Sequence, residues 1–471
     1  MRWLARIPAR WAAAGVAATG AAMLVLAGQG PATGAVGPGD WSAFLGGPAH
    51  ASDNRAQVAI TPGSAGALVR KWHFVGDLPN RPGQPDPAYN ASPTVADGAV
   101  FIGSRSGWFY KLDERTGKVL DKVFIGFQPT RTCTAGGFVA TATVARDPAD
   151  GQDTVYVGGP DGYLYALRAS DLSRKWRSVI AIPSKTISDY FQWSSPTVSG
   201  GRIYIGVSSH CDHPLIRGGV IGYLQATGKI FARYHDVPAG VIGGSVWSSV
   251  AADGQHVYVS TGNGTPGARL PYDTFSIVEL RASTLGRVAA FLPPRSQRLP
   301  DADFGASPAL FGSLVGACSK NGLFYALHVP SMTLAWERRV AKNPGGTGKA
   351  QCIASSAYDG KHLYVAAGST VIGGKTYPGS IRRLNPATGA VLWQTGLPDA
   401  VLGTPTLDGG GVIAVGTFGV GTAPNAVYLL DARTGHILRA LPTGSSDFAQ
   451  SVFAGGWLFT ANGNGVYAWG Q

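Results

Sequence analysis

Charged residues, methionines and cysteines are all scarce in this sequence, and the scarcity narrows the class of protein. Charged residues make up 14% of the 471 residues and apolar residues 45%, so the chain can bury a large core and disorder is excluded. A strong helical periodicity is also missing from the mature part of the chain. The 67 glycines and 31 prolines supply turns and interrupt helices, which favours many short strands.

Only four cysteines are present: Cys133, Cys211, Cys318 and Cys352. None lies in a CxxCH motif, so the sequence contains no attachment site for a c-type haem, and none forms a lipobox after the N-terminal apolar stretch. An even number of cysteines in an exported chain is consistent with two disulfides, in any of three connectivities.

The N-terminus has the pattern of a signal peptide. Three arginines precede an Ala/Gly-rich apolar stretch, and ATGA provides a small-residue cleavage site near Ala35. We therefore expect residues 1–35 to be removed and residues 36–471 to form the exported protein. A retained anchor is the alternative, but the apolar stretch is near the lower length limit for a membrane span, so stable membrane insertion is not expected.

The chain carries a formal charge of +12, and removal of the three arginines of residues 1–35 lowers it to +9. A basic exported protein suits acidic polymers or envelope surfaces. However, the basic residues are scattered, and no Lys/Arg run with interleaved aromatic residues marks a nucleic-acid site. A solvated basic surface without nucleic-acid binding is the simpler interpretation.

A repeat of strands tiles the mature chain. Its clearest copy is ASPTVADGAVFIGSRSGWFYKLDERTGKVL, residues 91–120: a small-residue strand, a β-branched strand, an aromatic strand, a Thr-Gly turn and a fourth strand. Counted from Ser92, the other copies begin near Thr141, Ser195, Ser249, Ser307, Ser355, Thr404 and Gln450. A period of this length is typical of four-stranded propeller blades, so the sequence predicts an all-β, eight-bladed propeller.

The eighth repeat ends after three strands. LVRKWHFVG, Leu68 to Gly76, has the Lys-Trp pattern of other fourth strands. We expect this N-terminal strand to complete the last blade, close the ring and remove an open sheet edge.

Unusual residues gather in the loops of one predicted face. The loop before the first strand and the loop between the second and third strands project from the same face of a blade, where a rigid scaffold carries its functional loops. Cys133, Trp193, Trp247, Asp301, Cys352, residues 208–217, Asn263, Cys318 and Lys320 all fall in or beside such loops.

These residues carry a family resemblance. The segments GGSVWSSVAADGQHVYVSTGNGTP, DTFSIVELRASTLG, LPDADFGASPAL and CSKNGLFYALH resemble successive segments of PQQ (pyrroloquinoline quinone)-dependent alcohol dehydrogenases, and are most similar to polyvinyl-alcohol dehydrogenases. The repeats resemble the family over nearly all of the mature chain, and the site motifs over about residues 208–328. Non-catalytic scaffold propellers share the repeats, but the ordered site motifs are more specific.

The resemblance implies a cofactor site with PQQ and Ca²⁺. Trp247 matches the tryptophan on which the quinone stacks, and Lys320 matches the basic residue that hydrogen-bonds the quinone carbonyls. Ser208, in the Gly-x-Ser run, is placed beside the cofactor. Asn263 and Asp301 match Ca²⁺ ligands, and Asp301 also matches the general base, with Asp303 as a nearby rival.

Each of these residues also has a purely structural interpretation. Trp193 occupies the same repeat position as Trp247, and Asn263 lies in an ordinary Asn-Gly turn. Asp301 is a surface acid that Arg295 or Arg298 could offset, and Lys320 is a solvated turn lysine in this interpretation.

The sequence departs from the family at two points. A glutamate ligand of Ca²⁺ is expected before Arg217-Gly218, but the segment reads GVSSHCDHPLIRGG, and Asp212 is the only carboxylate within reach. The family's adjacent cysteine pair is also absent. His210, Cys211, Asp212 and His213 could instead hold zinc or copper, although a disulfide at Cys211 with the histidines at a polar rim is the simpler interpretation.

Neighbouring blades 5 and 6 would bring Cys318 and Cys352 together, which favours that disulfide and leaves Cys133 with Cys211. The implied function is an exported PQQ-dependent alcohol dehydrogenase acting on a small alcohol or hydroxylated polymer. Hydride would pass to the quinone with an Asp base and Ca²⁺ as Lewis acid, and electrons would leave to a separate acceptor. The alternative is a non-catalytic propeller that binds a polysaccharide, peptide or envelope protein.

Overall fold

The structure is a computed structural model, and it describes residues 37–79, 84–128, 136–185, 188–265, 272–342, 352–419 and 425–471. The expected signal peptide, residues 1–35, and Cys133 lie outside the described residues. The described residues belong to one compact unit. In that part of the chain we find no helix with the length and apolar character needed to cross a membrane.

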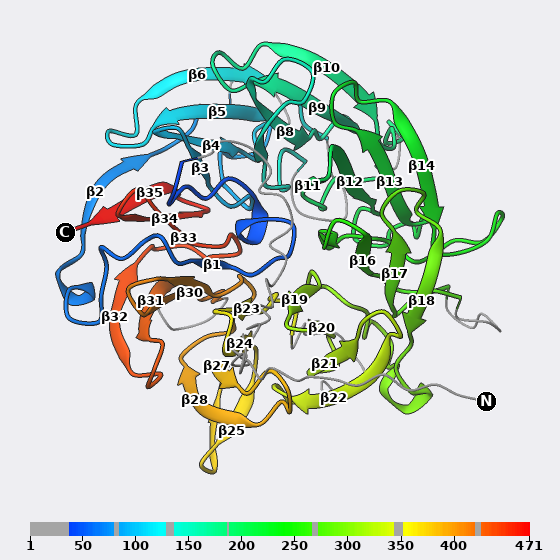
Figure 1. The fold of residues 1–471 in the computed structure, drawn as a ribbon. Helices are drawn as coiled ribbons and strands as arrows, with labels where there is room; N and C mark the ends of the chain where they lie inside the picture. The colour runs from blue at the N-terminus through cyan, green and yellow to red at the C-terminus, as the bar shows by residue number, and fades with distance from the viewer. Residues whose placement is uncertain are drawn as a thin grey trace, which may run out of the picture. The chain divides into compact units, whose positions relative to one another are not determined.

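Eight antiparallel four-stranded sheets follow one another around a ring (Figure 1), as the repeats predict. Blade 1 contains β3 (Thr94–Ala96), β4 (Ala99–Gly103), β5 (Trp108–Asp113) and β6 (Val119–Phe124); blade 2 contains β7 (Thr143–Arg146), β8 (Asp153–Gly158), β9 (Tyr163–Arg168) and β10 (Arg174–Val179). Blade 3 contains β11 (Thr197–Ser199), β12 (Arg202–Val207), β13 (Gly219–Leu224) and β14 (Ile230–His235); blade 4 contains β15 (Ala251–Ala252), β16 (His256–Ser260), β17 (Ile277–Arg281) and β18 (Arg287–Phe291). Blade 5 contains β19 (Ala309–Phe311), β20 (Leu314–Cys318), β21 (Leu323–His328) and β22 (Thr333–Arg339).

The remaining blades show one insertion and the ring closure. Blade 6 contains β23 (Ala357–Tyr358), β24 (Leu363–Ala367), β27 (Gly379–Leu384) and β28 (Val391–Leu397), with a hairpin of β25 (Thr370–Ile372) and β26 (Lys375–Tyr377) inserted. Blade 7 contains β29 (Thr406–Asp408), β30 (Val412–Gly416), β31 (Ala426–Asp431) and β32 (Ile437–Pro442); blade 8 contains β33 (Val452–Ala454), β34 (Trp457–Asn462), β35 (Gly465–Gly470) and β2 (Val69–Phe74). The N-terminal β2 pairs antiparallel with β35, which confirms the predicted closure.

Tryptophans on outer strands join neighbouring blades. Each packs on the glycine of a Thr-Gly turn in the next blade, at positive φ, where a methyl group would lie only 2.4–2.7 Å from an indole atom. The pairs are Trp72 with Gly117, Trp176 with Gly228, Trp336 with Gly389 and Trp393 with Gly435. The tryptophan of the fourth strand and the Thr-Gly turn of the next blade are therefore the two partners of one contact between blades.

Hydroxyl groups join the blades again near the ring axis. Seven of the eight first strands are preceded by a serine or threonine whose oxygen accepts the backbone N–H of its counterpart in the preceding blade, at 2.8–3.1 Å. The accepting residues are Ser92, Thr141, Ser195, Ser249, Ser307, Ser355 and Thr404, the positions at which the repeats begin. Gln450 takes this position in blade 8 and donates its own N–H to Ser92.

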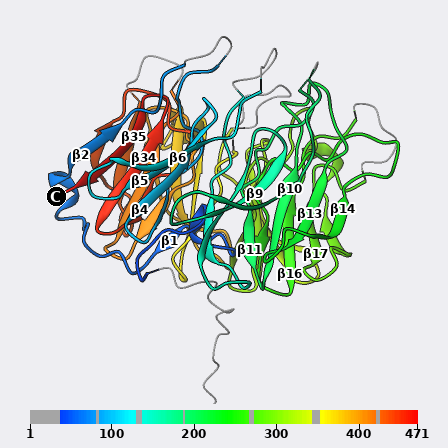
Figure 2. The ribbon, with the colours of Figure 1, turned by 90° about the horizontal axis from the view of Figure 1, so that it is seen from above.

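The segment before β2 also joins the blades, through backbone hydrogen bonds to their first strands. It contains two 3-10 turns, η1 (Phe44–Gly46) and η2 (Ala65–Ala67), and the short strand β1 (Asp53–Asn54), which is parallel to β29. Its carbonyls accept N–H groups at 2.7–3.0 Å from the first strands of six blades, at Val95, Val144, Ala252, Leu310, Tyr358 and Leu407. Figure 2 shows β1 near the lower edge of the ring in that view. The sequence did not predict this segment, nor the 3-10 turn η3 (Arg295–Gln297).

Candidate active site

Four predicted site residues lie in loops at one edge of blades 4 and 5. Trp247 precedes the first strand of blade 4 and Asn263 follows the second; Asp301 precedes the first strand of blade 5 and Lys320 follows the second. Antiparallel neighbours bring the start of one strand and the end of the next to the same sheet edge. The expectation that these residues share one face is confirmed by their direct contacts.

Lys320 is the centre of this group. Its Nζ lies 2.7 Å from Oδ1 of Asp301 and 2.7 Å from Oδ1 of Asp303, and 5.0 Å from the centroid of the Trp247 ring. Burial alone would lower the pKa of Lys320, but the attraction of Asp303 and then of Asp301 outweighs it, so the pKa lies above the usual lysine value. The lysine is therefore a permanent cation that faces an indole ring.

Asp303 is fully buried and is used on both carboxylate oxygens. Oδ2 accepts a hydrogen bond from Nε1 of Trp247 at 2.9 Å, Oδ1 pairs with Lys320, and its backbone carbonyl accepts the N–H of Lys320 at 3.0 Å. Burial raises the pKa of Asp303, and the Lys320 ammonium offsets part of the increase. Asp303 therefore contacts both Trp247 and Lys320, the two residues predicted to face a cofactor.

Asn263 joins the second part of the site. Its Nδ2 donates to Oδ2 of Asp212 at 2.9 Å and to Oδ1 of Asp301 at 3.0 Å, and Oδ1 of Asp212 accepts a 2.6 Å hydrogen bond from Ser209. The buried Oδ1 of Asn263 accepts no hydrogen bond from the described residues, although buried acceptors are normally satisfied.

These oxygens fit a hard cation. Asp212 and Asp301 accept hydrogen bonds from the amide nitrogen of Asn263, and the amide oxygen of the same side chain has no donor among the described residues. Lys320 balances one of the three negative charges that the carboxylates of Asp212, Asp301 and Asp303 carry when ionised. Ca²⁺ takes oxygen ligands of these kinds. In the part of the chain that the structure describes, no group of three or more His, Cys, Asp or Glu residues is arranged to hold a metal ion.

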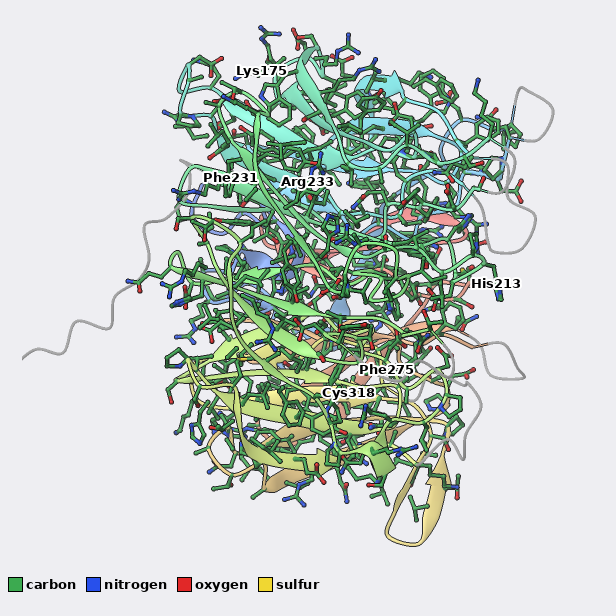
Figure 3. The ribbon with its side chains drawn as sticks, turned by 90° about the vertical axis from the view of Figure 1, so that its right-hand side faces the viewer. Lys175, His213, Phe231, Arg233, Phe275 and Cys318 are labelled. Carbon is green, nitrogen blue, oxygen red and sulfur yellow. A yellow bond between two sulfur atoms is a disulfide. The ribbon has the colours of Figure 1, made fainter. Side chains whose placement is uncertain are left out.

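The other predicted residues of segment 208–217 do not join the network. Ser208 is buried, and its hydroxyl donates to the carbonyl of Phe191. His210 stacks on Phe191 with ring centroids 4.5 Å apart. His213 is exposed and lies at the right-hand edge of the molecule in Figure 3. Cys211 is disulfide-bonded, as the simpler interpretation expects, and cannot supply a thiolate to zinc or copper.

A disulfide supports the site from blades 5 and 6. Cys318 and Cys352 are bonded, with Cα atoms 5.5 Å apart, which confirms the predicted pair. Both are fully buried, and Cys318 is labelled in Figure 3. Cys318 is two residues before Lys320, and Cys352 is next to Ile353. The expected partner of Cys211, Cys133, lies outside the described residues.

A small cavity of about 80 Å³ lies beside Trp247 at the ring axis, below the usual ~300–1,000 Å³ range of small-molecule pockets. Apolar side chains and the axial hydroxyl groups form its wall, and none of the lining residues is charged. The lining residues are Phe44, Asn90, Ser92, Val139, Thr141, Trp193, Ser195, Trp247, Ser248, Ser249, Gly305, Ser307, Ile353, Ser355, Leu402, Thr404, Phe448 and Gln450. Trp247 thus separates an uncharged cavity from a charged cluster.

Sequence reasoning missed two contributors to this arrangement. Asp303 was considered only as an alternative base, and Gly305 only as part of a motif. A Cβ atom at Gly305 would lie 2.3 Å from Cη2 of Trp247 and 2.8 Å from Cγ2 of Ile353, so this position requires glycine. The signal was the spacing Asp301-x-Asp303-x-Gly305, which places two acids and a glycine within five residues of the loop before the first strand of blade 5.

Comparisons with known proteins agree with the fold. A family profile, PQQ_2, described as "Outer membrane protein assembly factor BamB", matches residues 70–269 and 320–451. Quinohemoprotein alcohol dehydrogenase ADH-IIG of Pseudomonas putida is 27% identical over 233 residues, 44% of this chain and 30% of that protein. Quinohemoprotein alcohol dehydrogenase ADH IIB of Pseudomonas putida is 28% identical over 227 residues, 42% and 31% respectively. The match spans less than a third of the length of either relative.

Solved structures share the architecture at low identity. Quinohemoprotein alcohol dehydrogenase from Comamonas testosteroni has a TM-score of 0.72 at 18% identity, over 92% of this chain and 81% of that chain. A europium-containing methanol dehydrogenase has 0.71 at 14%, over 92% and 98%. BamB from Moraxella catarrhalis has 0.56 at 15%, over 86% and 98%. At these identities the likeness is one of fold.

Proposed function

Because the chain belongs to the PQQ_2 family and carries a charged cluster beside an axial cavity, we propose that it is an exported, PQQ-dependent alcohol dehydrogenase. The observation that carries the proposal is the unbroken set of contacts from Trp247 through Asp303, Lys320 and Asp301 to Asn263. Four of these residues, Trp247, Lys320, Asp301 and Asn263, are the ones that resemble the cofactor and catalytic positions of quinoprotein dehydrogenases. Distant sequence similarity to two quinohemoprotein alcohol dehydrogenases supports it.

The residues present would hold a quinone and a cation in adjoining places. The half-buried indole of Trp247 offers a flat surface to a planar cofactor, and Lys320 is a cationic hydrogen-bond donor beside it. Ser208, although turned to Phe191, stays a candidate for cofactor contact through its loop. Asp212, Asn263 and Asp301 would ligate Ca²⁺, with Asp212 in place of the family's longer glutamate.

When bound, the quinone would supply the hydride acceptor and Ca²⁺ the Lewis acid. Asp301 would take the proton of the alcohol. Its side chain is 47% exposed and its Oδ1 is held by Lys320 and Asn263, which leaves Oδ2 to act as the base. Asp303 is a poorer base because it is buried and both of its oxygens are engaged.

The substrate class that suits this site is an uncharged alcohol. The axial cavity offers apolar and hydroxyl groups and no charge, which suits a small primary or secondary alcohol or the end of a hydroxylated polymer such as polyvinyl alcohol. Electrons would leave to a separate acceptor. A buried disulfide supports an oxidising, extracytoplasmic location after cleavage near Ala35.

A second candidate is a non-catalytic propeller that binds a polysaccharide, peptide or envelope protein. The description of the family profile, an outer membrane protein assembly factor, favours it. The ion pairs of Lys320 also favour it, because Asp301 and Asp303 already neutralise the lysine charge without any ligand.

The two candidates are separated by reconstitution. Purified protein, first dialysed against EDTA, is supplied with PQQ and Ca²⁺, and dye-linked oxidation is followed with primary alcohols, secondary alcohols and short polyvinyl alcohol. We expect dye reduction that requires both PQQ and Ca²⁺. A folded protein that neither binds PQQ nor reduces the dye would reject the dehydrogenase and leave the binding propeller.

A further inference from the structure

Two residues of the segment that leads into blade 5 contact the Trp247 indole, Asp303 at Nε1 and Gly305 at the six-membered ring. Asp303 accepts the hydrogen bond of the indole Nε1 at 2.9 Å, and the six-membered ring lies where any side chain at Gly305 would clash, 2.3 Å from a Cβ atom. Lys320, held by Asp303, lies 5.0 Å from the ring centroid. Three contacts therefore define the position of the indole: the hydrogen bond from Nε1 to Asp303, the packing of its six-membered ring on Gly305, and the Lys320 ammonium near the ring.

Trp193 provides an internal comparison. It occupies the repeat position of Trp247 one blade earlier and also lines the axial cavity. The residue that corresponds to Asp303 there is Ser245, whose hydroxyl accepts the N–H of Ser209. Within the described ranges, no carboxylate hydrogen-bonds the Trp193 indole. We call the contacts of Asp303 with Trp247 and Lys320 the clamp. The clamp is found at one repeat and does not follow from the repeat pattern itself.

A buried carboxylate needs a reason to be there. Asp303 is 1% exposed, and burying an ionised group is costly unless it is paired and hydrogen-bonded. One of its oxygens accepts the hydrogen bond of Trp247 and the other pairs with Lys320. An apolar residue would fill the space without that cost, so stability alone does not explain an acid at this position.

We infer that Asp303 is a positioning residue that fixes the plane of the Trp247 indole and the place of the Lys320 ammonium, so that both face one planar ligand. The inference rests on the proposed function, because it assigns the ligand to the quinone class. Asp303 itself touches neither the substrate nor the reacting atoms; it acts through Trp247 and Lys320.

The test is a double-mutant cycle read by PQQ affinity in the presence of Ca²⁺. The variants are D303A, W247F and D303A/W247F, with W193F and D303A/W193F as the matched control pair and D303N as the conservative variant. If Asp303 acts through Trp247, D303A weakens PQQ binding about tenfold or more in the wild type and in the W193F background. In the W247F background only the position of Lys320 still depends on Asp303, so the same change has a smaller effect, of about threefold. D303N, whose amide oxygen can still accept the Nε1 bond, recovers part of the loss.

A merely structural role gives a different pattern: D303A would lower the free energy of unfolding equally in all backgrounds and leave the PQQ affinity of the folded protein unchanged. That result, or additive losses of affinity in D303A/W247F, would overturn the inference. A second measurement needs no cofactor. The near-ultraviolet circular dichroism spectrum of W247F is subtracted from that of the wild type, and the difference is the band of the Trp247 indole in its fixed orientation. Loss of this band in D303A supports the clamp and its retention rejects it, whereas failure of wild type to bind PQQ rejects the proposed function.

Discussion

The indole Nε1 of Trp247 donates a 2.9 Å hydrogen bond to Oδ2 of Asp303, across the junction of blades 4 and 5. One blade therefore supplies the flat surface and the next supplies the anchor that orients it. The same carboxylate pairs with Lys320, so the proposed cofactor contacts are coupled before any cofactor binds. Such preorganisation lowers the cost of ordering side chains when a ligand binds.

Replacement of Trp247 by alanine is expected to weaken PQQ binding by about 10- to 100-fold, since loss of an aromatic contact and its buried area costs roughly 1.5–3 kcal/mol. The matched control is W193A, at the same repeat position in the preceding blade, for which we expect a change of less than about threefold. Fluorescence titration of PQQ in saturating Ca²⁺ measures both. Equal losses in the two variants would show that the axial cavity, and not Trp247, selects the ligand.

Asp301→Asn is expected to lower kcat by about 10²- to 10⁴-fold through loss of the general base, because an amide cannot take the proton of the alcohol. PQQ affinity should change far less, since Trp247 and Lys320 stay in place. The control is D171N, at an exposed turn acid, which should leave kcat unchanged. Steady-state kinetics of dye reduction give the values, and a D301N protein with normal kcat would remove Asp301 from the role of base.

The eight blades, the closing strand and the Cys318–Cys352 disulfide could all be predicted because each leaves a local mark in the sequence. The hydroxyl residues at the repeat positions Ser92 to Thr404 recur since each accepts the same backbone hydrogen bond from the preceding blade. The closure followed from an unpaired last blade and from the Lys-Trp pattern around Trp72.

The segment of residues 37–60 left no such mark. It binds six blades through its backbone carbonyls, and carbonyls are the same in every residue, so no residue type signals the contact. The role of Asp303 was also hidden, because only its burial between Trp247 and Lys320 separates it from Asp301. Asn263, Asp301, Lys320 and Trp247 could be grouped beforehand, because the order of strands and loops places them at one edge.

Removal of the Cys318–Cys352 disulfide in C318S/C352S is expected to lower the free energy of unfolding by about 3–4 kcal/mol, because the bond closes a loop with a sequence separation of 34 residues. Urea unfolding followed by circular dichroism measures the change. Since Cys318 lies two residues from Lys320, PQQ affinity should also fall. A variant as stable as the wild type would show that packing of blades 5 and 6 suffices without the bond.

Asp447 gives a prediction of pH dependence. Burial raises its pKa from 3.8 to about 7, although Thr443 and Asn462 donate to the carboxylate. The folded protein therefore keeps a proton that the unfolded chain loses, so the contribution to stability is present at low pH and is lost as pH rises through about 7. Between pH 5 and pH 8 the loss amounts to about 2–3 kcal/mol.

The variant D447N is the test, because asparagine keeps a donor and an acceptor in this pocket and does not titrate. We expect the difference in unfolding free energy between D447N and wild type to shift in favour of D447N by about 2–3 kcal/mol from pH 5 to pH 8. Other titrating groups are common to both proteins and cancel. A pH-independent difference would mean that Asp447 is ionised throughout this range.

The proposed dehydrogenase is tested most directly by a crystal structure of the protein grown with PQQ and Ca²⁺. The account predicts the quinone plane against Trp247 within reach of Lys320, and the cation bound by Asp212, Asp301 and the amide oxygen of Asn263. A well-ordered structure in which Trp247 faces only solvent and the oxygens around Asn263 hold no cation, at ligand concentrations that saturate known quinoproteins, would contradict it.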